Sequence, residues 1–516
     1  MRATSEVVLP PPRIGPRRRI AVDLAAATHL LGALTAFLGL AALVPSAVAL
    51  WYGEPVWPFL LAGGITSGCG LALARATAGA GARVGAREGF LVVAATWLLA
   101  ACFGAVPYLL AGGEQFADPV DALFEGMSGF TTTGATVVTD FEALPRSLAI
   151  WRQLTQWLGG LGIIVLALAV LPRLRVGGRQ LFEAELPGPE VDQLGIRIRQ
   201  AVQRFWVLYV GLTVAEASIL ATLGWTGVDE KMTPFKAVAH ALTTVSTGGF
   251  STEARSIGAF APATQWVVVV FMVLAGTNLA LLYYAFVRGR LRPLLRDEET
   301  RLYVALLGLA SAVLLVELLT SEIEGSDAPL RNGVFQAVAI MTGTGYATVD
   351  FAAWPTLALM TLVLCMFVGG SAGSTTGSVK VVRHLVLGRV LRRELTQTLR
   401  PEVVMPIRLS GAVVDEKTLR AIVAFILLYL GLFVVGAGVI AVDASLQGPA
   451  LLPIDAISAA AATLGNVGPA AGPAGPMDSY EPFSDLSTLV MVALMWLGRL
   501  EVLPIVVLFT RSYWRP

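Results

Sequence analysis

The stretch DALFEGMSGFTTTGAT, residues Asp121–Thr136, decides the fold of this chain. It joins an apolar segment of about ten residues, too short to cross a bilayer, to a polar turn that contains a glycine. The same pattern returns as FKAVAHALTTVSTGGF (235–250), NGVFQAVAIMTGTGYA (332–347) and DAISAAAATLGNVGPA (455–470). When the four stretches are aligned without gaps, one glycine coincides in all of them: Gly134, Gly248, Gly345 and Gly468.

The composition places these stretches in a membrane protein. Of the 516 residues, 55% are hydrophobic and only 14% are charged, and the mean hydropathy is +0.71. One helix needs about 20 apolar residues to cross a bilayer core. Runs of this kind lie near residues 22–51, 57–76, 88–111, 147–172, 203–225, 264–287, 302–320, 354–390, 418–443 and 485–510. We therefore expect an all-α polytopic protein that crosses the lipid bilayer ten times.

The connecting loops predict the orientation of the chain. Arginines gather in alternate loops, for example at residues 17–19 and 288–296, and acids such as Glu114, Asp327 and Glu481 occupy the loops between them. Because positively charged loops stay on the cytoplasmic side, we expect both termini to be cytoplasmic. The formal net charge of +1 provides no basic field for a nucleic-acid partner.

Spanning runs flank each of the four stretches, so we expect four copies of one unit: helix, half-helix, polar turn and helix. The copies occupy residues 86–178, 200–290, 300–393 and 418–516. Their turns lie at residues 131–135, 245–249, 342–346 and 465–469. Three segments stand outside the units: a basic cytoplasmic N-terminus (1–20), an extra pair of transmembrane helices (21–80) and a cytoplasmic connection (394–417).

The polar turns predict a path for a dehydrated monovalent cation. Rings of backbone carbonyls can replace the hydration shell of an alkali cation, and the C-terminal end of each half-helix adds a partial negative charge. The candidate ligands are the two residues before each shared glycine: Thr132 and Thr133, Ser246 and Thr247, Gly343 and Thr344, Asn466 and Val467. None of them is acidic, which favours a monovalent over a divalent cation.

A second polar stretch, GGSAGSTTGSVKVVRH (369–384), interrupts the eighth apolar run. A flexible linker does not sit at membrane depth, and the spacing G-x-x-x-x-G-K-[ST] of a phosphate-binding loop is absent. We therefore interpret residues 369–380 as a break in the second helix of the third unit, where glycines ease unwinding and hydroxyls satisfy freed backbone groups. The residues of this candidate gate loop are Gly369, Gly370, Ser371, Gly373, Ser374, Thr375, Thr376, Gly377 and Lys380.

Three charged residues each allow two interpretations. Arg499 lies inside the last apolar run, where a charge is costly unless it faces water or a partner. It either pairs with a carbonyl or an acid inside the bundle or forms a barrier to cations in the pore. Glu501 does not share its helix face. Lys380 and Arg383 either belong to the loop or are positive-inside anchors.

Several motifs give the chain a resemblance to the Trk/Ktr/HKT superfamily of potassium uptake proteins, and within it to the TrkH subunits of Trk systems. They are FTTTGAT (130–136), QWLGGLGIIVLALAVLP (156–172), VFMVLAGTNLALLY (270–283), GGSAGSTTGSVKVVR (369–383) and MWLGRLEVLP (495–504). The resemblance implies a pseudo-fourfold arrangement of the units around one pore, with K⁺ bound in the turns. It supports Arg499 as the barrier and the loop as the gate.

The resemblance also implies partners and a location. We expect a homodimer in the bacterial inner membrane and a cytosolic TrkA-like regulatory ring, to which a nucleotide (ATP/ADP or NAD) would bind. The expected function is K⁺ uptake through a channel-like pore that this partner gates. A Na⁺-coupled or H⁺-coupled symporter of the Ktr/HKT type is the alternative that the sequence leaves open.

Two other classes of function are disfavoured. An enzyme or a nucleotide-driven pump would need a catalytic domain outside the membrane, and no segment between the apolar runs is long enough for one. We therefore expect neither catalysis nor an organic cofactor in this chain. A transporter built from inverted repeats is disfavoured because all four turns lie on the acidic, outer side.

Overall fold

The computed structural model describes residues 22–79, 85–169, 191–447 and 451–515. This part of the chain is almost entirely helical, and its strands are the short antiparallel pair β1 (Arg408–Leu409) and β2 (Ala412–Val413). The predicted basic N-terminus (1–20) lies outside the described residues.

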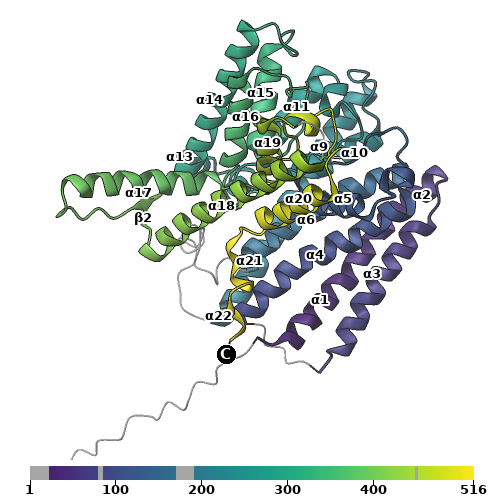
Figure 1. The fold of residues 1–516 in the computed structure, drawn as a ribbon, viewed down its shortest axis with the longest axis horizontal. Helices are drawn as coiled ribbons and strands as arrows, with labels where there is room; N and C mark the ends of the chain where they lie inside the picture. Colours follow the sequence, from purple (N-terminus) through teal and green to yellow (C-terminus); the bar gives the residue numbers. More distant parts are fainter. Residues whose placement is uncertain (1–21, 80–84, 170–190, 448–450, 516) are drawn as a thin grey trace, which may run out of the picture.

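The helices follow the four units (Figure 1). The first unit contains α4 (Ala86–Ala111), α5 (Pro119–Phe130) and α6 (Arg146–Ala169). The second contains α9 (Val191–Trp225), α10 (Pro234–Val245), α11 (Pro262–Ala275) and α12 (Leu279–Phe286). The third contains α14 (Glu298–Thr320), α15 (Pro329–Met341), α16 (Thr356–Val368) and α17 (Val381–Leu399). The fourth contains α18 (Glu416–Gln447), α19 (Pro453–Leu464), α20 (Asp485–Arg499) and α21 (Leu503–Leu508).

Three helices precede the units: α1 (Leu24–Leu38), α2 (Leu43–Tyr52) and α3 (Trp57–Ala76). Helices α1 and α3 lie beside α4 in Figure 1 and contact it, whereas α2 contacts α6. The two remaining α-helices of the described residues are short: α13 (Arg292–Arg296), which leads into α14, and α22 (Arg511–Trp514) near the C-terminus. The predicted extra pair therefore packs on the outside of the first unit.

The predicted half-helices are α5, α10, α15 and α19. They have 12 or 13 residues each, fewer than a bilayer crossing needs. Each has a proline in its first turn, where the missing N–H costs no hydrogen bond and the fixed φ suits a helix. Asp118 and Thr233 cap two of them with their side chains. Local sequence thus determines where each half-helix begins, and each ends in the buried interior.

Fewer helices cross the membrane without interruption than the ten apolar runs suggest. Among the described residues, six helices are long and apolar enough to span a bilayer, or seven if one bent pair is counted as a span. The bent pair is α11 and α12, which meet at 111°. Helix α16 ends at Val368, just before the polar loop, and α20 ends at Arg499. The second helices of units two, three and four are therefore interrupted at polar or charged sequence.

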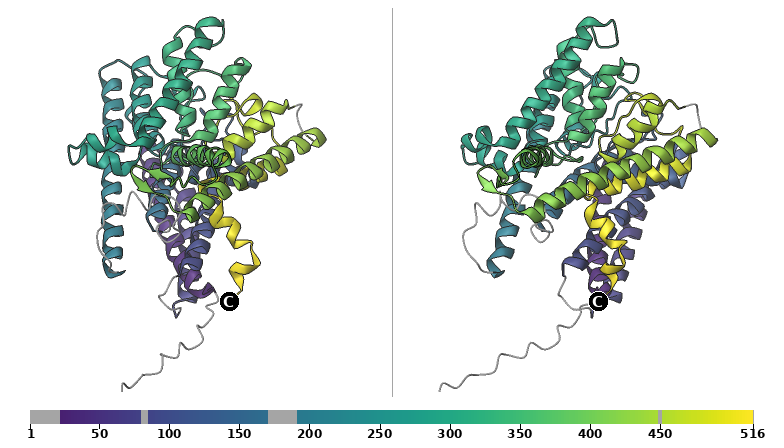
Figure 2. Two further views of the ribbon diagram at one scale, coloured as in Figure 1. Left: turned by 90° about the vertical axis from the view of Figure 1, so that its left-hand side faces the viewer. Right: turned by 60° about the vertical axis from the view of Figure 1, so that its left-hand side comes forward.

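Helix α20 packs along α18 and against α19 (Figure 2). Gly498, near the end of α20, permits this approach. A Cβ atom at this position would lie under 3.0 Å from the carbonyl oxygen of Leu464, the last residue of α19. Because real Cβ atoms do not come so close to a carbonyl oxygen, any larger residue would push the two helices apart.

Gly498→Ala should lower the free energy of unfolding by about 1–3 kcal/mol, the usual cost of overpacking a close contact. The measurement is the midpoint of thermal unfolding of the purified protein in detergent. Gly431→Ala in α18 is the control, because a Cβ there would meet no atom within 4 Å and alanine favours a helix. Equal midpoints for the two variants would contradict the packing argument.

Candidate functional site

The four half-helices run into four turns of the same backbone shape. In each turn two residues, separated by one other, have positive φ, a conformation that favours glycine. The pairs are Thr132 (52°) and Gly134 (83°), Thr247 (54°) and Gly249 (81°), Gly343 (69°) and Gly345 (73°), and Asn466 (53°) and Gly468 (102°). The repeat seen in the sequence is therefore a repeat of backbone conformation.

In the second turn, the glycine of the ring lies one residue later than the sequence alignment predicts. The gapless alignment selects Gly248 as the shared glycine, but the residue with the equivalent positive φ is Gly249. The cause is that α10 ends at Val245, one residue later in this alignment than the other half-helices. Ser246, predicted as a ligand, is the C-cap residue, and its hydroxyl donates back into the helix. The residues that precede the equivalent glycine are Thr247 and Gly248.

The turns close into a ring. A Cβ atom on the glycine of each turn would lie under 3.0 Å from a backbone carbonyl oxygen of the next turn. The pairs of glycine and carbonyl are Gly134 with Gly248, Gly249 with Thr344, Gly345 with Val467, and Gly468 with Thr133. Only glycine fits there, both for its φ and for the space. Since the series of contacts returns to the first turn, the four turns surround a common axis in chain order.

Two buried side-chain oxygens of the ring have no partner. Thr132 Oγ1 and Asn466 Oδ1 make no hydrogen bond within the described part of the chain. The amide nitrogen of Asn466 is satisfied, because it donates to Thr133 Oγ1 at 3.0 Å and to the carbonyl of Met495 at 3.0 Å. Buried oxygens without partners are costly unless something binds them. These neutral oxygens, together with the turn carbonyls, fit a monovalent cation.

Buried polar side chains of α6 bind the first half-helix and the second turn. Arg152 forms a 2.7 Å ion pair with Glu125 of α5, and both side chains are almost completely buried. Gln156 donates to the carbonyl of Gly248 at 2.7 Å and accepts a hydrogen bond from the backbone N–H of Phe250 at 3.0 Å. Our sequence predictions did not include these residues. The signal that could have revealed them is a set of polar residues inside a spanning run.

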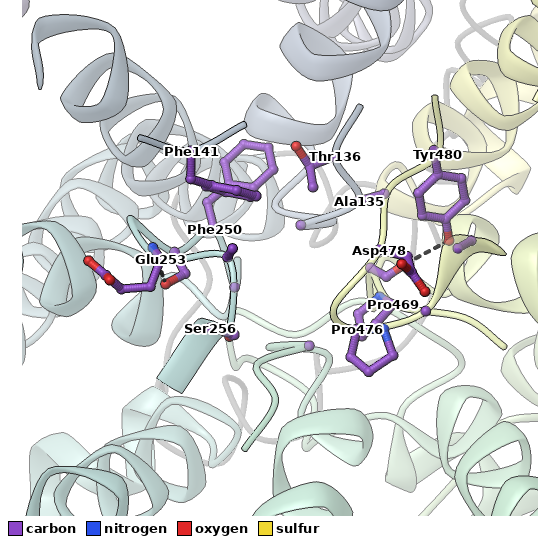
Figure 3. Close-up of a pocket in the computed structure, with 18 of the residues that line it drawn as sticks. Ala135, Thr136, Phe141, Phe250, Glu253, Ser256, Pro469, Pro476, Asp478 and Tyr480 are labelled. Atoms are coloured by element: carbon purple, nitrogen blue, oxygen red, sulfur yellow. Dashed lines mark hydrogen bonds between the residues drawn. The ribbon is translucent and has the colours of Figure 1, made fainter. Parts of the chain in front are cut away.

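A pocket lies over one end of the ring (Figure 3). The glycines of all four turns line it, and the acidic side chains of Glu253 and Asp478 stand at its wall. Burial and the neighbouring Asp350 raise the pKa of Asp478 above its ordinary value. Carboxylates at the wall of a pocket raise the local concentration of cations, whereas the ring itself is built from neutral oxygens.

The predicted gate loop fills the gap between α16 and α17 and contacts the ends of two half-helices. The hydroxyl of Thr375 donates to the carbonyl of Val245 in α10 at 3.2 Å. The hydroxyl of Thr247 in turn lies 3.3 Å from the Thr375 hydroxyl. Ser378 donates to the carbonyl of Gly465, the C-cap residue of α19, at 3.0 Å. The hydroxyl residues of the loop, Ser371, Ser374, Thr375 and Thr376, are all buried. The loop therefore lies at the half-helix end of the ring, opposite the pocket.

Glu299, in the first turn of α14, binds both this loop and the first turn of α17, which follows it. Its Oε1 atom accepts hydrogen bonds from the backbone N–H of Ala372 at 2.6 Å and of Val382 at 3.2 Å. The side chain is buried, with only 3% of the residue exposed. The preceding residue, Glu298, pairs with Arg389 of α17 at 2.8 Å. Sequence reasoning missed Glu299 because its partners are more than 70 residues away in the chain.

The structure gives Lys380 and Arg383 a different role from that of positive-inside anchors. Glu501 forms ion pairs with Arg383 at 2.7 Å and with Lys380 at 3.4 Å. All three side chains are largely buried. The C-terminal end of the loop is therefore tied to the segment that follows α20.

Arg499 lies against the same loop. Its Nη1 atom donates to the carbonyl of Thr375 at 2.9 Å, and only 2% of the residue is exposed. Its Nε and Nη2 atoms have no hydrogen-bond partner among the described residues, and no carboxylate there pairs with it. Helix α20 stops at Arg499, and the next turn has positive φ at Glu501 (59°) and Val502 (54°). A buried guanidinium without a carboxylate partner thus sits beside the loop.

Comparisons with known proteins agree with this architecture. The sequence model of the TrkH family, described as cation transport proteins, matches residues 61–515. The chain is 35% identical over 496 residues to the Trk system potassium uptake protein TrkH of Halomonas elongata, and the match covers 94% of this chain and 98% of that protein. It is 33% identical over 497 residues to the Trk system potassium uptake protein TrkG of Escherichia coli, covering 95% and 98%.

A solved structure shows the same fold. The crystal structure of the potassium transporter TrkH from Vibrio parahaemolyticus superposes with a TM-score of 0.84 at 32% sequence identity, covering 96% of this chain and 100% of that chain. The apolar helices and these matches together make the chain a multi-pass membrane protein. It belongs to the TrkH family of cation transport proteins.

Proposed function

We propose that the chain is the potassium-translocating subunit of a Trk system and that K⁺ passes along the axis of the four turns. The relatives named above are potassium uptake proteins of Trk systems. The observation that carries the proposal is the closed ring of four glycine turns, which brings backbone carbonyls and two unpartnered side-chain oxygens together without a carboxylate.

The ring suits an ion that has lost its water. Carbonyl dipoles in sufficient number replace the hydration shell of an alkali cation, and four half-helices end at the ring with the partial negative charge of their C-termini. A divalent cation would more often be held by carboxylates. The neutral oxygens therefore favour a monovalent cation, and the potassium uptake proteins among the relatives favour K⁺ as that cation.

In this proposal the loop at residues 369–380 is the gate, and Arg499 is the barrier. The loop lies against the ends of α10 and α19, and Arg499 places a positive charge beside it. A cation that leaves the ring on this side meets both obstacles. Flux then depends on displacement of the loop, as in a channel that opens and closes.

We further infer a homodimer in the bacterial inner membrane, with both termini cytoplasmic and with a TrkA-like ring that binds the regulatory nucleotide. The subunit names of the relatives support an assembly, because each is a protein of a Trk system. The connection formed by α17 and the β1–β2 pair is a suitable contact for the TrkA-like ring. The ion pair of Arg389 with Glu298 joins this connection to α14, the helix that holds the loop.

Expression of the chain, together with a TrkA-type partner, should restore growth at low K⁺ in a bacterium without its own K⁺ uptake systems. Gly345→Ala should abolish the rescue, because a methyl group has no room beside the carbonyl of Val467. Gly308→Ala in α14, where a Cβ meets no atom within 4 Å, should keep it. No rescue by the unaltered chain, at expression confirmed by immunoblot, would contradict the proposed function. Uptake that follows an imposed Na⁺ or H⁺ gradient would favour the symporter instead.

Arg499→Ala should raise Rb⁺ flux into proteoliposomes by roughly tenfold, which requires a barrier lower by only about 1.4 kcal/mol. The exposed Arg400→Ala in the cytoplasmic connection is the matched control and should leave the flux unchanged. A correctly folded Arg499→Ala protein with the flux of the unaltered chain would argue against the barrier.

Glu299→Gln should raise Rb⁺ flux in the absence of any regulatory partner by roughly two- to tenfold. The amide keeps the shape of the side chain but loses the charge that strengthens its hydrogen bonds to the loop. The control is Glu322→Gln, an exposed acid beyond the other end of α14. If both variants conduct like the unaltered chain, Glu299 does not hold the gate.

A further inference from the structure

The hydroxyl of Tyr480 donates a hydrogen bond to the carbonyl oxygen of Gly468 at 2.7 Å (Figure 3). Gly468 is the glycine of the fourth turn of the ring. Tyr480 lies in the segment between α19 and α20, and only 2% of it is exposed. A side chain from outside the turn thus holds one carbonyl of the ring at the end that faces the pocket.

Tyr480 is fixed by contacts with two different units. Its backbone N–H donates to the carbonyl of Thr136, just past the first turn, at 2.8 Å. Its ring packs against Phe124 of α5 and Phe483, with centroids 5.3 Å and 5.6 Å away. Because the ring is held by the first unit and the hydroxyl reaches the fourth turn, Tyr480 bridges the boundary between these two quarters of the pore.

The bond makes the fourth turn different from the others. Among the described residues, no side chain donates to the carbonyl of the equivalent glycines Gly134, Gly249 and Gly345. Three carbonyls at this level are therefore free to adjust to an ion, and the fourth is held by the tyrosine. The four turns share one backbone conformation, but the carbonyl of Gly468 is less free to move than those of the other three glycines.

We propose that Tyr480 is a selectivity-determining positioning residue of the ion path. In the cavity-size account of selectivity, carbonyls held at the distance that suits K⁺ cannot close around the smaller Na⁺. To coordinate Na⁺ closely, the carbonyls must move inward. The Gly468 carbonyl cannot follow without breaking its bond to the hydroxyl, so the bond opposes Na⁺ more than K⁺. This inference rests on the proposed function of the ring as a K⁺ path.

The test is Tyr480→Phe, which removes the hydroxyl and keeps the ring with its packing. Purified protein in proteoliposomes is assayed for uptake of radioactive Rb⁺ and of radioactive Na⁺ under identical gradients. We expect the ratio of Na⁺ to Rb⁺ uptake to rise roughly two- to tenfold. This factor corresponds to the net free energy of one neutral hydrogen bond.

Tyr513→Phe is the matched control. Tyr513 is also buried, packs against an aromatic neighbour and donates to a backbone carbonyl, that of Arg87, at 2.6 Å. This bond joins α22 to the start of α4 and lies outside the ring. We expect the unaltered Na⁺ to Rb⁺ ratio in this variant.

Two results would overturn the inference. One is an unchanged ratio in Tyr480→Phe protein that elutes and unfolds like the unaltered chain. The other is an equal loss of Rb⁺ and Na⁺ uptake, which is the effect of a merely structural residue. Absence of Rb⁺ uptake by the unaltered chain would instead contradict the proposed function, so the two failures can be told apart.

Discussion

Backbone that leaves the helical conformation inside a membrane protein must be buried or line water, and this constraint governs the structure. Four turns leave the helix at this depth, and each meets the constraint in the same way: its glycine lets a carbonyl of the next turn come close. Because these contacts form a closed series, no turn can shift without its neighbours. The half-helices, which start at prolines, deliver the turns to the ring, and the longer helices hold them there.

The ring combines one backbone pattern with several kinds of side-chain support. Gln156 binds the second turn on both sides of Gly249, and a buried ion pair lies next to the first turn. Tyr480 holds the carbonyl of the fourth turn. The same backbone turn is thus supported by different side chains in three of the four quarters. A substitution at one support therefore acts on one quarter of the ring, which is why single hydroxyl and amide groups are informative probes of selectivity.

Charged groups gather at the other end of the ring, where two second helices break. Glu299 is buried and Glu501 is largely buried, and both find their partners in the loop or in the first turn of α17, which follows it. Buried charges are costly when a partner is removed. A loop that moved away would cost Glu299 its bond to Ala372 and Glu501 its pair with Lys380, so water or new donors must replace these two contacts. The closed position is stabilised from two different units, while Arg499 contributes a single bond to the loop.

The sequence by itself determined the half-helices, three of the four ring glycines and the position of the polar loop. These features depend on local pattern: the length of an apolar run, a proline at its start and glycines where φ is positive. Only the tertiary structure decided that Gly249 completes the ring, because the end of α10 is set by how the turn packs against the next one. It also decided the partners of Arg499 and Glu501, since residues separated by more than 100 positions meet there. Periodicity describes one helix at a time, whereas the ring and its gate consist of contacts between helices.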